Sequence, residues 1–385
     1  MTDQESALLP GPADLPNRRR LMPEAVRFTS AFCNTPQCSA ARSSLLTGLE
    51  PHQTHVITNV GEGSLGKPLS PDIPNVGSVF HAAGYTTGYF GKWHLGGTRS
   101  SFGFETIGRE GPDDTVASEA AAWLRKQTSP WLAWVSVLNP HHIYSIPQVL
   151  KTIEPRRGVL PPASGLNNLA GKPGEQQAYV DKDQGQQTRN FKPEDWLKYR
   201  TFYLQLLEKT DANLGTVLSA VVDMDNTIVV CTADHGDALG EHGLPYKGPF
   251  MYEEEIRIPL LIRTPKLMPA GDRDELVTQA DLAPTLARLC GLPWPKPITG
   301  KSLLPGTLAR DAVFLEYYAK QKWVNPIRTL RTRRWKLNWY DSGHQELYDL
   351  SADPQELQNL ASDAKAHATK AEMEARLNAW RGPMM

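Results

Sequence analysis

The sequence predicts an α/β protein with a largely parallel sheet. Three short apolar or β-branched segments, residues 85–90, 131–138 and 227–232, each follow a segment whose apolar residues recur with helical spacing. Strands that alternate with helices along a chain pair in parallel, because the helix returns the chain to the same end of the sheet. Each of the three segments runs directly into His, Lys or Asp residues. Ligands bind beyond the carboxyl ends of such strands, so we expect these polar residues to meet in one site.

The helices that precede these strands are expected at residues 76–83, 116–126 and 194–222. In the first of them, Val76, Val79, Phe80 and Ala83 fall on one helical face, and Gly84 follows where a C-cap belongs. The pattern thus repeats three times as helix, strand and polar cluster, as expected of an α/β protein with a largely parallel sheet.

Composition excludes several classes of protein. The 385 residues carry 41 Lys and Arg against 42 Asp and Glu, a net charge of −1, which argues against a nucleic-acid or polybasic membrane binder. The longest apolar stretch, residues 131–138, is far shorter than the roughly 20 residues of a membrane helix. The first 25 residues lack the apolar core of a secretory signal, so the chain as given is expected in the cytoplasm, unless a signal precedes it. Four cysteines without C-x-x-C spacing exclude a disulfide scaffold.

Two regions depart from the repeating pattern. Residues 145–192 are rich in Gly, Pro, Gln and Asn, and we interpret them as a long loop insertion, either a surface excursion or a lid that shapes access to the site. After residue 291, strand-like segments at 312–318, 335–340 and 346–349 precede a helical segment at 363–380. We therefore expect a catalytic domain over residues 1–291, and over 292–385 a small antiparallel sheet covered by a helix.

Residues 38–48 have the features of a helix that begins at a cysteine. Gly48 stands at the C-cap position, and Arg42 lies one turn after Cys38 on the same face. The positive end of the helix dipole and a neighbouring guanidinium both acidify a thiol, so Cys38 is a candidate nucleophile. A buried structural cysteine next to a surface arginine has the same short pattern, and the two residues alone do not separate these readings.

The longer string does separate them. Residues 38–48, Cys-Ser-Ala-Ala-Arg-Ser-Ser-Leu-Leu-Thr-Gly, resemble the sulfatase signature C-x-[PA]-x-R-x-x-L-x-T-G at every fixed position. Further segments resemble sulfatase blocks in the family's order: Gly-Lys-Trp-His-Leu-Gly at 91–96, Asn-Pro-His-His at 139–142, and Thr-Ala-Asp-His-Gly-Asp at 232–237 with Lys247 after it. The resemblance implies an alkaline-phosphatase-like three-layer sandwich around a mostly parallel sheet.

The resemblance also implies a reaction. In sulfatases a separate maturing enzyme oxidises the signature cysteine to Cα-formylglycine, whose hydrate attacks the sulfur of a sulfate ester. Transferred to this chain, Cys38 is the precursor of the nucleophile, and Asp234 accepts the proton of the attacking hydroxyl. The other implied roles fall to basic side chains that neutralise sulfate, protonate the leaving oxygen or release the product: Arg42, Lys92, His94, His141 and Lys247.

A divalent cation is implied as well. Its expected ligands are the group derived from Cys38, Asp234 and His235, and the pair Asp3 and Gln4 in the opening Met-Thr-Asp-Gln. Oxygen ligands suit a hard cation while the imidazole tolerates a softer one, so calcium is the first expectation and manganese the second. In sulfatases the first strand lies directly before the first two ligands. Because the chain as given starts at them, we expect a sheet without that strand and two ligands on a fraying terminus.

Three other functions compete with sulfate ester hydrolysis. A phosphate or phosphonate ester hydrolase on the same fold uses similar ligands, although Lys92 and His94 favour sulfate. An inactive, truncated homologue acting as a binding protein is the second. A thiol redox protein using Cys33 and Cys38 is the third, and their separation is not a redox spacing. Whether the small-molecule substrate is an aryl, carbohydrate or other alkyl sulfate stays open.

Overall fold

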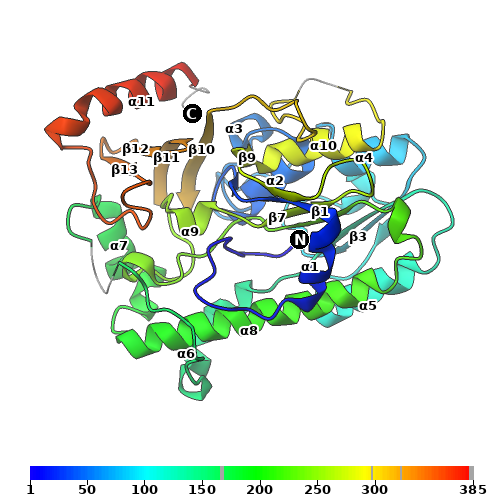
Figure 1. Ribbon diagram of the computed structural model, residues 1–385, viewed down its shortest axis with the longest axis horizontal. Helices are drawn as coiled ribbons and strands as arrows, with labels where there is room; N and C mark the ends of the chain where they lie inside the picture. Colours follow the sequence, from blue (N-terminus) through cyan, green and yellow to red (C-terminus); the bar gives the residue numbers. More distant parts are fainter. Residues whose placement is uncertain (165–168, 296–297, 321–322, 381–385) are drawn as a thin grey trace.

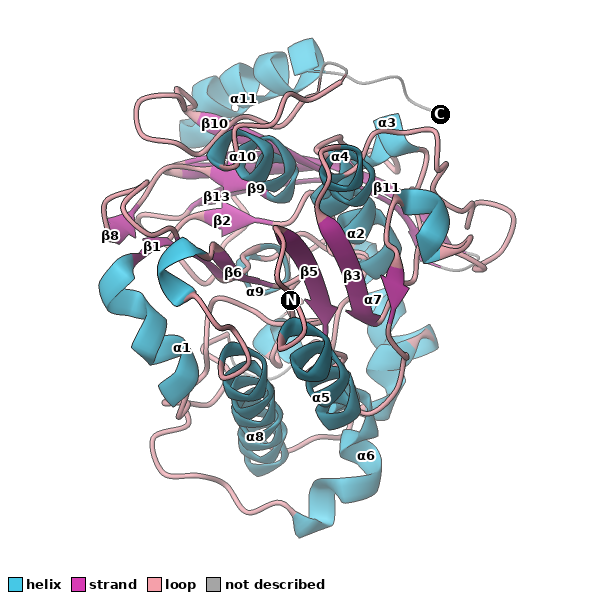
Figure 2. Ribbon diagram, turned by 90° about the vertical axis from the view of Figure 1, so that its right-hand side faces the viewer, coloured by secondary structure: helices cyan, strands magenta, loops and turns pink. Residues whose placement is uncertain are grey.

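The computed structural model describes residues 1–164, 169–295, 298–320 and 323–380. Its helices form two layers with strands between them (Figures 1 and 2). One layer holds α1 (Pro16–Leu21), α5 (Asp113–Leu124) and α8 (Pro193–Leu218), and the other holds α2 (Cys38–Thr47), α4 (Val76–Ala82) and α10 (Leu282–Leu289). The predicted three-layer α/β sandwich is confirmed.

The strands between the layers form two main groups. In the first, β6 (Val229–Thr232), β7 (Leu260–Arg263), β1 (Ala25–Phe28) and β8 (Gly271–Arg273) lie in that order, with β7 antiparallel to both neighbours. In the second, β3 (Thr86–Gly91) lies between β4 (Thr106–Ile107) and β5 (Trp131–Ser136), and all three are parallel. The short strands β2 (Ala31–Phe32) and β9 (Val277–Thr278) pair in parallel. The three predicted strands thus appear as β3, β5 and β6.

The first residues of the chain lie between the two groups. Thr2 pairs in parallel with Ala233 just after β6, and Asp3 pairs in parallel with Pro140 beyond β5. The amino group of Met1 donates to the carbonyl of Val135 at 2.8 Å. Strands β5 and β6 form no ladder with each other, so residues 1–3 join the carboxyl ends of the two groups. The expectation of a fraying terminus is wrong, because backbone bonds on both sides hold this segment.

The C-terminal sheet follows the predicted plan. Strands β10 (Ala312–Lys320), β11 (Trp323–Thr332), β12 (Trp335–Tyr340) and β13 (Gln345–Asp349) are antiparallel in chain order, and α11 (His367–Trp380) packs on β11 and β12. The sequence did not predict β11, whose interior holds a proline and two arginines. Pairing with strands on both sides overrides its poor strand pattern. Val313 and Leu315 share a hydrophobic core with Val26 and Ile262 of the main sheet, so the two sheets pack together.

The insertion over residues 145–192 contains helices that its composition did not indicate. They include α6 (Ile146–Val149), α7 (Gly174–Lys182) and η5 (Gln184–Gln187). Tyr179 on α7 is fully buried, and its hydroxyl donates to the carbonyl of Pro245 at 3.0 Å. The described part of the insertion is therefore anchored on the loop that follows β6, and residues 165–168 lie outside the described residues.

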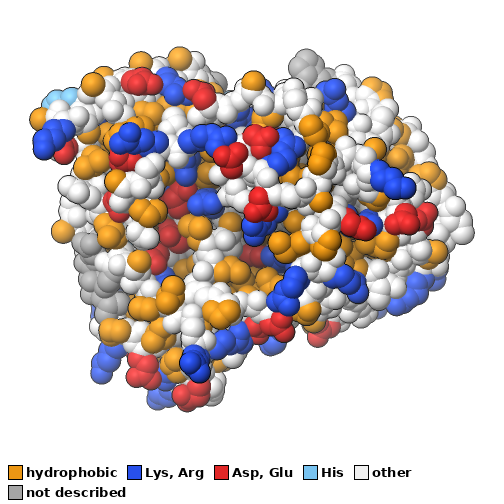
Figure 3. Space-filling model, viewed as in Figure 1, with side chains coloured by type: hydrophobic (Ala, Val, Ile, Leu, Met, Phe, Trp, Pro, Cys, Tyr) orange, Lys and Arg blue, Asp and Glu red, His pale blue; other side chains and the backbone are white. Residues whose placement is uncertain are grey.

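The remaining short helices connect these elements: η1 (Met22–Glu24), α3 (Pro51–Thr54), η2 (Arg99–Phe102), η3 (His141–Ser145), η4 (Leu150–Thr152), η6 (Met224–Asn226), η7 (Glu241–Gly243), α9 (Glu253–Ile256), η8 (Gln279–Asp281) and η9 (Ala364–Ala366). Over the described ranges, no helix has the length and the hydropathy that a membrane span requires. Positive and negative side chains are interspersed on the face shown in Figure 3, in keeping with the balanced composition.

Candidate active site

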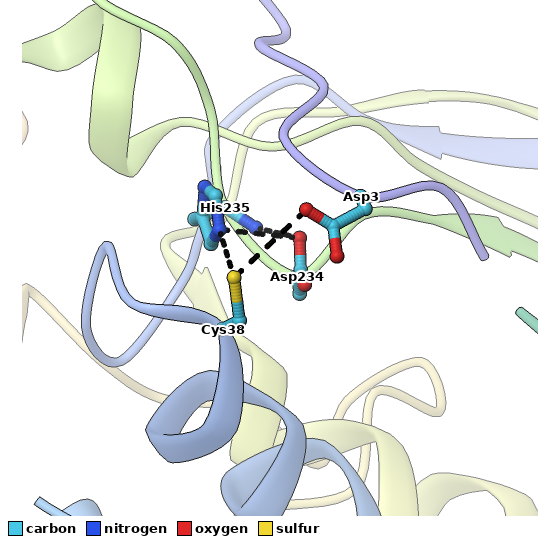
Figure 4. A group of neighbouring side chains, drawn as sticks. All are labelled: Asp3, Cys38, Asp234 and His235. Atoms are coloured by element: carbon cyan, nitrogen blue, oxygen red, sulfur yellow. Dashed lines mark hydrogen bonds and ion pairs between the residues drawn. The ribbon is translucent and has the colours of Figure 1, made fainter. Parts of the chain in front are cut away.

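Cys38 is the first residue of α2, and α2 ends at Gly48 in the left-handed conformation, as predicted. The helix points its N-terminus at the segment after β6 and at the first residues of the chain. Figure 4 shows that the side chains of Asp3, Cys38, Asp234 and His235 turn toward one another from these three segments. Every one of them is almost completely buried. The fold thus brings together residues that are up to about 230 positions apart in the sequence.

These four side chains offer ligand atoms that all lie within 4.8 Å of one another. The Cys38 Sγ lies 3.3 Å from Nε2 of His235 and 3.9 Å from Oδ1 of Asp3. Two carboxylates, an imidazole and a sulfur in this space form a donor set that a divalent cation accepts.

Gln4 presents a further oxygen. Its Nε2 donates to Oδ2 of Asp237 at 2.7 Å, while its Oε1 is buried and has no hydrogen-bond partner among the described residues. Gln4 also has a φ of 71°, an uncommon conformation for a residue other than glycine that is often found at functional sites. A buried amide oxygen that accepts no hydrogen bond is suited to coordinate a cation. The ligand atoms of the site therefore agree with the implied metal.

Asp237 and Tyr199 are site residues that the sequence analysis did not single out. Asp237 accepts hydrogen bonds from the Tyr199 hydroxyl at 2.9 Å and from the Leu239 amide at 2.8 Å, in addition to Gln4. Both side chains are buried. Asp237 stands inside the block at residues 232–237, but only the fold shows that it holds the Gln4 amide.

Arg42 has a different position from the one expected. Its guanidinium donates to Oδ2 of Asp3 at 2.8 Å and to Oδ2 of Asp234 at 2.9 Å, and also to the Lys92 carbonyl and the Ser136 hydroxyl. It is not among the side chains that line the cavity above Cys38. Its donors are therefore committed to the two carboxylates, whereas the sequence analysis directed them at sulfate oxygens.

Two lysines flank Cys38. The Lys247 Nζ lies 2.7 Å from the Cys38 Sγ and 2.7 Å from Nε2 of His235. Lys92 forms an ion pair with Asp3, and its Nζ lies 3.6 Å from the sulfur. Burial and the Asp3 carboxylate raise the pKa of Cys38, but Lys247, Lys92 and His235 outweigh them, so the pKa lies well below that of an ordinary thiol.

His94 and His141 both line the cavity above Cys38. Within the described part of the chain, the buried Nδ1 of His94 has no hydrogen-bond partner, and the residue has a φ of 59°. Burial lowers the pKa of His141 to about 3, and Lys247 and Lys92 add to this effect while Asp3 opposes it. His141 is therefore neutral near pH 7, with two ring nitrogens to exchange protons with a ligand.

The cavity above Cys38, which we call the active cavity, has a volume of about 400 Å³. Its floor carries the predicted residues Cys38, Lys92, His94, His141 and Lys247. Its outer wall was not predicted, and it comes from several separate segments: Asn59, Glu62, Tyr144, Gln184, Tyr317 and Lys320. No local pattern marks these residues, because β10 and the insertion reach the cavity only through tertiary packing.

The chain is similar to known proteins in sequence. Residues 2–292 match the sulfatase family, and residues 240–382 match the C-terminal region of N-sulphoglucosamine sulphohydrolase. The Delta 4,5-hexuronate-2-O-sulfatase of Bacteroides thetaiotaomicron is 28% identical over 390 residues, which cover 92% of this chain and 80% of that protein.

Solved structures agree in fold. A 2-O GAG sulfatase superposes with a TM-score of 0.87 and 25% identity, over 98% of this chain and 90% of that one. The phosphonate monoester hydrolase of Agrobacterium radiobacter reaches a TM-score of 0.81 at 23% identity, over 98% of this chain and 95% of that one. The family match spans well over half of the sequence and includes the Cys38 helix, Lys92 and Asp234. The chain therefore belongs to the sulfatase family of sulfuric ester hydrolases.

Proposed function

We propose that this protein hydrolyses a small-molecule sulfate ester to an alcohol and inorganic sulfate, using a formylglycine made from Cys38 and a bound divalent cation. The observation that carries the proposal is the position of Cys38. Its side chain lies on the floor of the active cavity, between two lysines and beside the group Asp3, Asp234 and His235.

When bound, the cation, with calcium the first expectation and manganese the second, would supply positive charge that lowers the pKa of the attacking hydroxyl. Asp3, Gln4, Asp234 and His235 hold it together with the modified Cys38. In this scheme Arg42 is a positioning residue, because its donors orient the Asp3 and Asp234 carboxylates.

The cavity floor supplies the remaining chemistry. Lys92 and Lys247 bind the non-bridging sulfate oxygens and neutralise charge as the S–O bond to the leaving group breaks. Asp234 accepts the proton of the attacking hydroxyl. Lys247 donates a proton to the leaving oxygen, to which the neutral His141 can donate a hydrogen bond, and His94 removes the proton of the second hydroxyl so that sulfate departs and the aldehyde returns.

A separate maturing enzyme is the partner this proposal requires, since nothing in the site itself oxidises a thiol to an aldehyde. We also propose the division of the chain into a catalytic domain at 1–291 and a C-terminal subdomain at 292–385. The two parts share a hydrophobic core, and the C-terminal subdomain contributes Tyr317 and Lys320 to the wall of the active cavity.

The test is mass spectrometry of the peptide spanning Cys38 after co-expression with a maturing enzyme, followed by turnover of 4-nitrophenyl sulfate. We expect the aldehyde in place of the thiol and metal-dependent hydrolysis that is absent in Cys38→Ala. A protein that carries the aldehyde and the metal but does not cleave sulfate esters would refute the proposal and support an inactive homologue.

Phosphonate or phosphate ester hydrolysis is the second candidate, supported by the fold similarity to a phosphonate monoester hydrolase. The two are compared with 4-nitrophenyl sulfate, 4-nitrophenyl phosphate and a 4-nitrophenyl phosphonate on one matured preparation. We expect the highest kcat/KM for the sulfate. A higher kcat/KM for either phosphorus ester would reverse the assignment.

A further inference from the structure

A second hollow lies next to the active cavity. It has a volume of about 600 Å³ and runs between α7 and the C-terminal sheet. Its walls include Glu175 and Lys182 of α7, Trp323 of β11 and His344 in the turn before β13. We call it the side groove. Its volume falls in the range of small-ligand sites in proteins.

Lys320 joins the two hollows, because it lines both of them. Its Nζ donates to Oδ2 of Asp183 at 3.0 Å and to Oε1 of Gln184 at 2.9 Å. Gln184 lines the active cavity, while Asp183 lines the side groove. The boundary between them is therefore a single layer of polar side chains. A ligand too long for the active cavity would extend across this boundary into the side groove.

The side groove combines an aromatic surface with both signs of charge. Trp323 is half-buried and packs against the hydrophobic cluster that includes Tyr179 and Val180. Glu175 accepts from the Ser342 hydroxyl at 2.6 Å and pairs with Nδ1 of His344 at 3.0 Å. Lys182 adds an exposed ammonium. Such a surface offers hydrogen-bond donors and acceptors for hydroxyl groups next to an indole ring. Its charges are of both signs, whereas binding of an anionic polymer requires a surface of predominantly positive charge.

We propose that the side groove binds a second sugar unit of a sulfated oligosaccharide whose sulfated unit occupies the active cavity. This inference rests on the proposed sulfatase function and names its substrate class as saccharide sulfates of at least two units. The active cavity agrees with it, since Asn59, Glu62 and Gln184 in its outer wall present polar groups that hydroxyls can bond. The linkage between the units passes Lys320.

The experiment compares matured enzyme on 4-nitrophenyl sulfate, on sulfated monosaccharides and on disaccharides with the same sulfated unit, sampling N-, 2-O-, 4-O- and 6-O-sulfates. For at least one pair we expect a kcat/KM about tenfold or more higher for the disaccharide. Trp323→Ala removes this advantage and leaves 4-nitrophenyl sulfate turnover within twofold. The matched control is Trp335→Ala, which replaces a partly buried tryptophan of β12 that lines neither hollow and leaves the advantage intact.

Two results would overturn the inference while the proposed function stands: aryl sulfate turnover with no disaccharide preferred over its monosaccharide, or a Trp323→Ala variant that loses activity equally on all substrates. If the matured enzyme cleaves no sulfate ester, the proposed function fails and the groove is tested by binding. Calorimetric titration of the same disaccharides then compares Cys38→Ala with Cys38→Ala/Trp323→Ala. No binding, or equal binding by both, refutes the groove.

Discussion

Among the described residues, two clusters of buried charge differ in a way that separates a reactive site from a structural one. The first is the active site around Cys38. The second, which we call the anchor cluster, consists of Glu253, Arg331, Lys336 and Glu356. It joins α9 to strands β11 and β12 of the C-terminal sheet. Lys336 is 0% exposed, as buried as any residue of the active site. Burial of charge therefore does not distinguish the two.

The partners of the lysines do distinguish them. The Lys336 ammonium donates to the Met251 carbonyl at 2.6 Å and to Glu253 at 3.2 Å, and it forms an ion pair with Glu356 at 2.5 Å, so its close partners are oxygens of the protein. Lys247 instead lines the active cavity and contacts the Cys38 sulfur and the ring of His235. A buried lysine that is saturated by carboxylates holds the fold together, whereas one that faces a nucleophile and a cavity is available for chemistry.

The largest expected effect is on the anchor cluster. Lys336→Met leaves Glu253 and Glu356 close together without the ammonium between them, and we expect the free energy of unfolding to fall by about 3–5 kcal/mol. Urea denaturation of the parent and of Lys336→Met measures this loss of stability. The kcat/KM of the folded fraction should stay within about twofold of the parent. A loss of less than about 1 kcal/mol would show that the cluster is not what anchors the sheet.

The reciprocal change is Lys247→Met. Removing a group that stabilises developing charge lowers kcat by about 10²–10³-fold. The free energy of unfolding should change by less than about 1 kcal/mol, because Arg42 and Lys92 still pair with the carboxylates. Steady-state kinetics and urea denaturation on one preparation give both values. Activity within threefold of the parent, or a stability loss like that of Lys336→Met, would remove the contrast between the clusters.

A smaller effect is expected behind the metal ligands. Asp237→Asn introduces a donor opposite the Gln4 amide, which can then turn its NH₂ group toward the cation. We expect affinity for calcium to fall about 10–100-fold, as changes behind metal ligands typically cause. Calorimetric titration measures the dissociation constant directly. Tyr199→Phe, which removes only one of the bonds to Asp237, serves as the milder control. An unchanged dissociation constant would contradict the positioning of Gln4 by Asp237.

The smallest effect is a pH dependence beside the anchor cluster. Burial, and then the carboxylates of Glu241 and Glu356, raise the pKa of Glu254 to about 8. The folded state thus holds this proton more tightly than the unfolded chain, and stability falls as pH rises from about 4.5 to about 8. Glu254→Gln removes the titration, so its free energy of unfolding should fall less between pH 5 and pH 8 than that of the parent. Urea denaturation of the parent and of Glu254→Gln at the two pH values measures this change. An equal fall in the free energy of unfolding of both proteins would contradict this assignment.

Local sequence determined the elements that carry the chemistry. Helix α2 from Cys38 to Thr47, the strands β3, β5 and β6 and the polar residues after them all follow from short-range periodicity, capping and the sulfatase motif. These patterns are readable because a helix or a buried strand imposes its own spacing of apolar residues. The order of the blocks was enough to name Cys38, Lys92 and Lys247 as neighbours.

Only the tertiary structure decided how these residues are used. It turned Arg42 toward two carboxylates, set Asp237 behind Gln4, and brought Lys320 from the C-terminal sheet to the insertion at Gln184. These partners are separated by about 40 to more than 200 residues, so no local spacing relates them. Their contacts follow from how sheets and helices pack as whole units, and that packing depends on side-chain shape and burial over the entire chain.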